Sequence, residues 1–221
     1  MNETRDETQQ RLIHRLEAFS DIIIGFSLAQ LALSLAIPKN GAEGLLEHPE
    51  PLIAFVITFA LVCGMWWAHH KLFVHYFVPI PVMVILNFIT LAGVSFAVYS
   101  VQLMLHQAPP PPPGARPVSG HSSMDFVFYL SSLGVVYGLL GIQYLYGWNV
   151  RREHLPTKVA DDGLRSSLML VGVGLASGTT AAVALRYGLR TASIQYFGFV
   201  IVAYAIALRL LFRFWRKRAT A

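Results

Sequence analysis

Six stretches of predominantly apolar residues divide the chain of 221 residues, and more polar segments separate them. They are Ala18–Ile37, Pro51–Ala68, Val82–Leu105, Phe126–Trp148, Leu168–Leu185 and Ile194–Leu208. Most approach the roughly 20 residues that a helix needs to cross the hydrocarbon core of a bilayer. The last is shorter, and we expect Arg209 and Arg213 to snorkel so that its helix reaches Phe214. The pattern predicts an all-α integral membrane protein with six transmembrane helices.

Composition agrees with a chain that lies mostly in lipid. Hydrophobic residues make up 55% of the sequence and charged residues 13%, and the mean hydropathy is +0.53. A soluble globular domain carries roughly 25% charged residues. We therefore divide the chain into a polar cytoplasmic N-terminus (1–11), a six-helix transmembrane domain (12–214) and a basic cytoplasmic tail (215–221).

The distribution of Lys and Arg predicts the orientation. With the N-terminus inside, 13 of the 17 Lys and Arg residues fall on the inner side. They lie in or beside the N-terminal segment, the loops after the second and fourth stretches, and the C-terminal tail. This bias places both termini in the cytoplasm. The net charge of +5 is then explained by topology, and a nucleic-acid partner is not needed to account for it.

Small residues recur at helical spacing in the fourth and fifth stretches. Gly134 and Gly138 are four residues apart, as are Gly174 and Gly178. Such pairs let helix backbones approach closely in lipid. We interpret them as packing contacts, within or between subunits.

Polar residues in the first three stretches carry the main functional signal. The first helix begins R-x-x-x-F-S-D, with Asp21 at its inner end. The second ends in "WWAHHKLF", and the third carries one amide, Asn87. An Asp at the centre of a membrane helix costs about 2.5–3.5 kcal/mol on insertion scales, less near the boundary. We expect these groups to meet at one depth and to satisfy one another.

The combination of F-S-D, W-x-x-H-H-x-x-F and a lone Asn in three successive spans resembles the transmembrane protein 175 family. Those proteins are potassium channels, and the bacterial ones have one six-helix repeat per chain. The resemblance implies that 12–214 is a channel domain in the inner (plasma) membrane of a bacterium. It implies a homotetramer with a pore lined by the first helix and narrowed by apolar rings, which passes potassium without a cofactor.

The resemblance also assigns a polar network that fixes the pore helix. Its residues would be Arg15, Phe19, Ser20, Asp21, Trp66, His69, His70 and Asn87. An alternative for His69 and His70 is an interfacial pair that caps the helix or snorkels.

One face of the first helix is the expected pore lining. At 100° per residue, the candidate pore-lining residues form one stripe about 100° wide. These are Ile22, Phe26, Ala29, Gln30, Leu33 and Ile37. Ser20, Ser27 and Ser34 recur every seven residues on another face, where they suit close helix contact.

By count from F-S-D, the family's apolar constrictions fall on Phe26, Gln30 and Leu33, and its Thr-like polar ring falls near Ala29. Phe26 is bulkier than usual, Gln30 is polar and Ala29 lacks a hydroxyl, so this chain departs from the family's pattern at the positions expected to set selectivity. We expect Phe26 or Leu33 to form a dewetting gate and Gln30 amides to offer oxygens to a cation. The alternative is that Gln30 hydrogen-bonds to a neighbouring helix.

Other functions remain open from the residues alone. A non-selective or proton-leaking pore of the same fold is one alternative, and a non-conducting relative is another. An intramembrane metal enzyme would use His69, His70 and His75 as ligands. However, no second His-rich box accompanies them, and we expect neither a metal site nor enzymatic activity. A secondary transporter would place ionisable groups near the midplane, where this sequence has none.

Overall fold

The structure is a computed structural model that describes residues 2–35, 41, 43–44, 49–105 and 123–187. Five long helices account for most of the described residues, and no strand occurs among them. The helices are α1 (Asn2–Leu33), α3 (Glu50–Lys71), α4 (Pro81–Leu105), α5 (Ser123–Arg151) and α6 (Thr157–Tyr187). Short turns follow two of them: η1 (Leu72–Tyr76), a π-helix, and η2 (Arg152–His154), a 3₁₀-helix.

The described helices match the first five predicted apolar stretches. Four of them, α1, α4, α5 and α6, are long and apolar enough to cross a membrane by length and composition. The chain is therefore a multi-pass membrane protein. The sixth stretch, Ile194–Leu208, and the basic tail, 215–221, lie outside the described residues, so the count of six spans stays a prediction.

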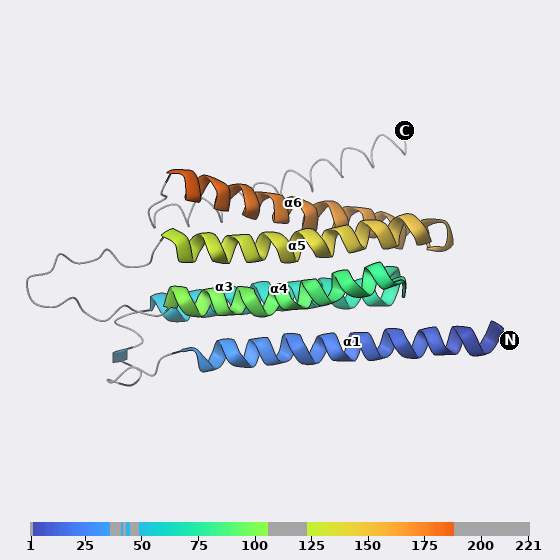
Figure 1. Cartoon of the computed structure of the whole chain (residues 1–221), viewed down its shortest axis with the longest axis horizontal. Coiled ribbons are helices and arrows are strands. Elements are labelled where there is room, and N and C mark those ends of the chain that lie inside the picture. The colour runs from blue at the N-terminus through green and yellow to red at the C-terminus, as the bar shows by residue number, and fades with distance from the viewer. Residues whose placement is uncertain (1, 36–40, 42, 45–48, 106–122, 188–221) are drawn as a thin grey trace, which may run out of the picture.

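The helices run roughly parallel to one another in a bundle (Figure 1). α1 lies at one edge beside α3 and α4, and α5 packs between α4 and α6. The N-terminus, the α3–α4 connection and the α5–α6 connection all lie at one end of the bundle. The predicted cytoplasmic residues Lys71, Arg151 and Arg165 are at or near this end. The polar segment 2–11 is helical and continuous with α1.

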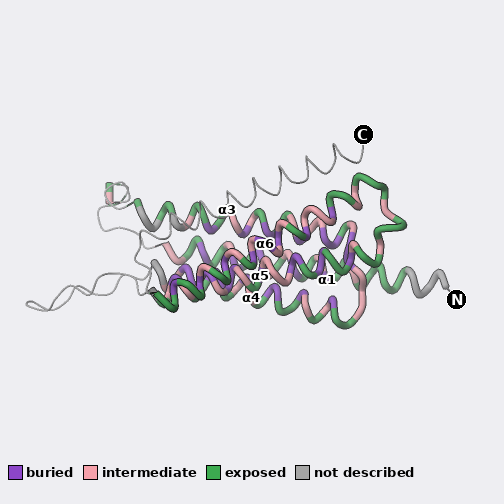
Figure 2. The backbone as a smooth tube through the Cα atoms, turned by 90° about the horizontal axis from the view of Figure 1, so that it is seen from above, coloured by how far each residue is buried: buried purple, intermediate pink, exposed green. Residues whose placement is uncertain are grey.

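The core follows the centre of the bundle, and every helix mixes buried and exposed positions along its length (Figure 2). The largest cluster of buried apolar side chains brings together Ile24 and Leu31 of α1, Met65 of α3, Val98 of α4 and Leu140 of α5. A smaller cluster, which includes Leu16, Phe73, Phe77 and Met83, closes the end that holds the N-terminus. The apolar clusters therefore join α1 to α3 and α4 along most of its length.

Glycines allow a close helix contact between α5 and α6. A Cβ added to Gly174 would lie 2.7 Å from the backbone nitrogen of Gly138 and 2.9 Å from the carbonyl oxygen of Gly134. A Cβ added to Gly134 would lie 3.2 Å from the carbonyl oxygen of Gly174. The two predicted glycine pairs therefore pack against each other within one subunit, where a side chain at Gly134 or Gly174 would force the backbones apart.

This contact predicts a difference between two glycines on the same face of α6. Gly174→Ala should destabilise the protein by about 1–3 kcal/mol, because the added methyl group meets backbone atoms that cannot move aside. Gly178→Ala is the matched control, since a Cβ there has no atom within 4 Å. Thermal unfolding of the detergent-solubilised protein measures both. Equal midpoints for the two variants would contradict the packing described here.

Candidate functional site

α1 has one face packed against the bundle and one face left exposed. Its packed face carries Leu16, Ser20, Ile24, Ser27 and Leu31, all buried. These positions recur every three or four residues, the spacing of one side of a helix. The opposite side carries large apolar residues that have no partner in the single chain.

Most of the predicted pore residues lie on this exposed face. Ile22 is 69% exposed, Phe26 71% and Leu33 86%, and Ala29 and Gln30 are also exposed. The Gln30 side chain makes no hydrogen bond within the described part of the chain. The alternative in which it bonds a neighbouring helix is therefore not seen among these residues. Ile37 lies outside the described residues.

A buried chain of hydrogen bonds connects three helices near the middle of α1. His69 Nε2 of α3 lies 2.7 Å from Asn87 Oδ1 of α4, and Asn87 Nδ2 donates to Ser20 Oγ of α1 at 3.2 Å. Because an amide oxygen can only accept, the Nε2–H of His69 is the donor. All three side chains are almost fully buried. Asn87 therefore bridges the two helices that flank it.

A second set of polar contacts lies beside this chain, closer to solvent. Trp66 Nε1 donates to Asp21 Oδ1 at 2.8 Å, and His70 Nδ1 lies 2.9 Å from Glu17 Oε1. The Trp66 and His70 rings stack, with centroids 6.1 Å apart. The last two turns of α3 thus hold two acids of α1, one turn apart.

Phe19 and Arg15 differ from the rest of the predicted network. Phe19 packs edge-on against Phe88 of α4, with ring centroids 5.9 Å apart. Arg15 is exposed and forms no hydrogen bond or ion pair within the described residues. Counting 100° per residue from Asp21, Arg15 falls at about 120°, the same direction as Leu33. It therefore lies on the exposed face, away from Trp66 and His69.

α4 also contacts α1 through two further polar side chains nearer its C-terminus. Ser95 Oγ lies 3.2 Å from Ser27 Oγ, and Gln102 Nε2 donates to the backbone oxygen of Gln30 at 3.3 Å. With Asn87 and Ser20, these contacts occur about every two turns along α4, which runs in the same direction as α1. Together, Asn87, Ser95 and Gln102 determine which side of α1 is turned away from α4.

Three of these partners, Glu17, Ser95 and Gln102, were not singled out from the sequence. Glu17 had one available signal, because it precedes Asp21 by four residues and therefore lies on the same helix face. Ser95 and Gln102 had none beyond their polarity, since Ser and Gln are also found bonded to their own helix.

The histidines do not form a metal centre in the described part of the chain. There, no group of three or more His, Cys, Asp or Glu side chains is placed to hold a metal ion. His69 is buried against Asn87 and Phe73, His70 contacts Glu17, and His75 lies beside Tyr76. The three histidines thus have different neighbours.

The fold is that of TMEM175 channels. The chain aligns over 92% of its length, and 93% of the other chain, with a crystallised variant of the potassium channel MtTMEM175 bound to a nanobody–MBP fusion protein, at a TM-score of 0.61 and 19% identity. It aligns over 90% of its length, and 97% of the other chain, with a lysosomal potassium-selective channel TMEM175 homologue from Chamaesiphon minutus, at a TM-score of 0.61 and 17% identity.

Sequence comparison agrees with the fold over the first part of the chain. Residues 15–97 match the family described as endosomal/lysosomal potassium channel TMEM175. A protein of Marivirga tractuosa described as a potassium channel is 31% identical over 90 residues. That alignment covers 41% of this chain and 36% of the relative's length. The predicted resemblance to the transmembrane protein 175 family is confirmed, and the family and these relatives are described as channels, not as enzymes.

The bridge made by Asn87 predicts a large effect of one substitution. Asn87→Leu should destabilise the protein, at about 1–3 kcal/mol for each buried partner that loses its hydrogen bond. Ser100→Ala is the matched control on α4, because Ser100 is equally buried but bonds only the carbonyl oxygen of Phe96 in its own helix. Thermal unfolding compares the two. A smaller loss for Asn87→Leu than for Ser100→Ala would contradict the bridging role.

Proposed function

We propose that this chain is the subunit of a passive cation channel that conducts potassium, with a pore lined by α1 of four identical subunits. The observation that supports this most is the exposed face of α1, on which the polar Gln30 lies between Phe26 and Leu33. The potassium-channel descriptions of the matched family and relatives point the same way.

A lipid-facing position for this stripe is less favourable than an axial one. An amide that faces hydrocarbon has no hydrogen-bond partner, and burying such a group unpaired costs roughly 2–7 kcal/mol. Arg15 extends the same face toward the end of the bundle, where a pore would open to water. Ala29 is also on this side and is small enough for α1 helices to approach one another closely.

The pore needs several subunits because each chain offers one α1, and the resemblance to the family supplies the number four. A single α1 cannot enclose a pore, whereas closed rings of identical subunits repeat one heterologous contact around an axis. In such a ring Phe26 and Leu33 place apolar side chains around the axis, and constrictions of this kind gate by dewetting. The Gln30 amides then supply oxygens to a partly dehydrated cation between them.

The polar contacts at the inner end of α1 give the pore helix its orientation in this proposal. Trp66, His69, His70 and Asn87 hold Ser20, Asp21 and Glu17 on the packed side, so that the stripe from Ile22 to Leu33 faces the axis. Phe19 and Arg15 then lie at the inner mouth. With both termini cytoplasmic, this mouth opens into the cytoplasm of a bacterial cell, across its inner membrane.

Gln30 and Ala29 depart from the family's pattern at positions that bear on potassium selectivity. Gln30→Ala, reconstituted into liposomes, should change the ratio of potassium to sodium permeability, because it removes the oxygens that replace water around the ion. Planar-bilayer recordings with potassium and sodium on opposite sides measure this ratio as a reversal potential. An unchanged ratio would remove Gln30 from the selectivity site, whereas a wild-type ratio near one would favour the alternative, a non-selective or proton-leaking pore of the same fold.

Two neighbouring positions on α1 separate a pore face from a lipid face. In a Cys63→Ser background, Leu33→Cys should let a charged, water-soluble thiol reagent block most of the current. Ala32→Cys should not, because Ala32 is also exposed but lies about 100° around the helix, outside the predicted stripe. Block at Ala32→Cys alone, or at neither position, would contradict the assigned face.

A further inference from the structure

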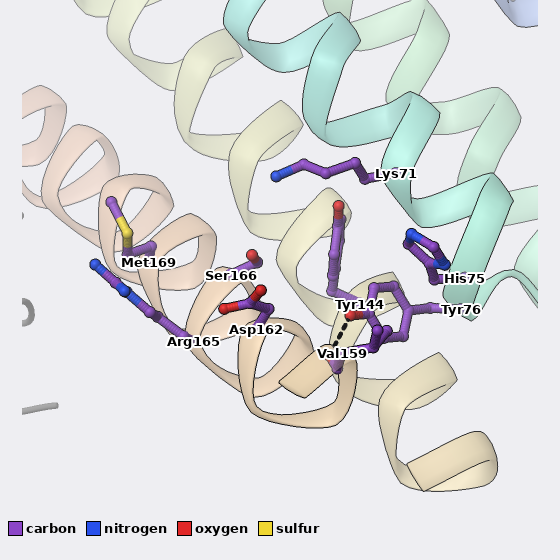
Figure 3. A pocket seen from close by; sticks show the side chains of 9 residues that line it. All are labelled: Lys71, His75, Tyr76, Tyr144, Val159, Asp162, Arg165, Ser166 and Met169. Atoms are coloured by element: carbon purple, nitrogen blue, oxygen red, sulfur yellow. Dashed lines mark hydrogen bonds between the residues drawn. The ribbon is translucent and has the colours of Figure 1, made fainter. Parts of the chain in front are cut away.

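A cavity of about 300 Å³ lies between α3 with its η1 turn, α5 and the start of α6. Basic and polar residues line much of it, and Figure 3 shows them around the opening. They are Lys71, His75, Arg165, Ser166 and Asp162, with Tyr76, Tyr144, Val159 and Met169 completing the wall. None of them belongs to the predicted pore or to the polar contacts of α1.

The wall of this cavity is held in place by close packing of Tyr76. Its hydroxyl donates to the backbone oxygen of Val159 at 2.6 Å. A Cβ on Gly163 would lie 2.6 Å from its ring, and a Cβ on Gly147 would meet its backbone. Burial, with a smaller effect of the Asp162 carboxylate, raises the pKa of Tyr76 above its ordinary value, so the hydroxyl stays protonated and keeps this bond. These contacts therefore hold the part of the cavity wall formed by Tyr76 in place.

Tyr144 strengthens the same wall from α5. Its hydroxyl donates to the backbone oxygen of Ala68 at 2.6 Å, and its ring lies 5.1 Å from that of Tyr76. Both hydroxyls are thus occupied by backbone carbonyls. The groups left to meet a ligand are the charged and hydroxyl side chains at the opening.

Those groups have an excess of positive charge. Lys71 and Arg165 are partly buried, and neither forms an ion pair within the described residues. Lys71 Nζ lies 5.9 Å from the centre of the Trp67 ring, and in Figure 3 its chain reaches toward the part of α6 that carries Asp162 and Ser166. Asp162, the one acid in the lining, is exposed. Two cationic side chains, Lys71 and Arg165, thus line the cavity together with a single carboxylate, that of Asp162.

We propose that this cavity binds a phosphate group, either that of an anionic lipid or a free phosphate. Guanidinium and ammonium groups are the usual partners of phosphate oxygens, and a serine hydroxyl adds a donor. The cavity is at the end of the bundle assigned to the cytoplasm, and basic pockets between transmembrane helices on that side bind lipid head groups. The proposal depends on the cavity alone and is independent of whether the chain conducts ions.

Binding to the purified full-length protein in detergent tests the proposal with three probes. They are inorganic phosphate, a short-chain phosphatidylglycerol and a short-chain phosphatidylcholine, whose phosphate is neutralised by choline. Binding of phosphatidylglycerol but not inorganic phosphate supports a lipid site, and binding of inorganic phosphate supports a site for free phosphate. Binding of none of the three, or equal binding of phosphatidylcholine and phosphatidylglycerol without inorganic phosphate, would overturn the proposal.

Variants locate the binding. The double variant Lys71→Met, Arg165→Gln should weaken it about tenfold or more, the scale of lost charge-assisted hydrogen bonds. Lys158→Gln is the control, because Lys158 is exposed, lies near the start of α6 and does not line the cavity. Equal weakening by Lys158→Gln would show non-specific attraction and reject the site.

A gain-of-binding variant guards against loss of fold. Asp162→Asn removes the only negative charge from the lining and should tighten binding about threefold, the effect of one partly exposed charge. Misfolding cannot produce this result. Unchanged or weaker binding by Asp162→Asn would show that the cavity does not recognise negative charge.

Discussion

The Asn87 side chain is the contact on which the position of α1 depends. Its amide bonds His69 on one side and Ser20 on the other, inside a junction from which water is excluded. In hydrocarbon, packing between apolar side chains fixes distance better than rotation, because one apolar surface can slide over another. A buried amide with two partners has few acceptable positions, since any rotation leaves polar groups without hydrogen bonds. The polar contacts that Glu17, Asp21 and Ser27 make with α3 and α4 lie on the same packed side of α1 as Ser20.

The sequence carried enough information to predict the helices and many of the polar contacts that join α1 to α3 and α4. Apolar length predicted five of the described helices, and the glycine spacing predicted the contact between α5 and α6. Asp21, Trp66, His69 and Asn87 were recognisable because polar side chains in a membrane helix need partners, and these were the few candidates at one depth. Their motif also carried the resemblance that the comparisons confirm.

The details of pairing could not be predicted from the sequence. It gave no reason to pair His70 with Glu17 rather than to leave it at the interface, because either arrangement satisfies an imidazole. Ser95 and Gln102 gave no signal that they bond α1. Arg15 was expected near Trp66 and His69, but its position on the helix turns it toward the exposed face. The position of a residue in the chain predicts its depth in the membrane. Its contacts depend in addition on how each helix is rotated about its own axis.

The Gln102 contact has a mechanical consequence. Gln102 bonds the Gln30 carbonyl about one turn before α1 ends, and Asn87 bonds Ser20 nearer the middle of α1. The stretch between them is therefore tethered to α4 at both ends. In a channel built from this subunit, α1 would lose both hydrogen bonds if it tilted or twisted alone to widen a passage. Either the two helices swing together as a rigid pair, or the side chains of Phe26 and Leu33 change rotamer while the backbone stays in place.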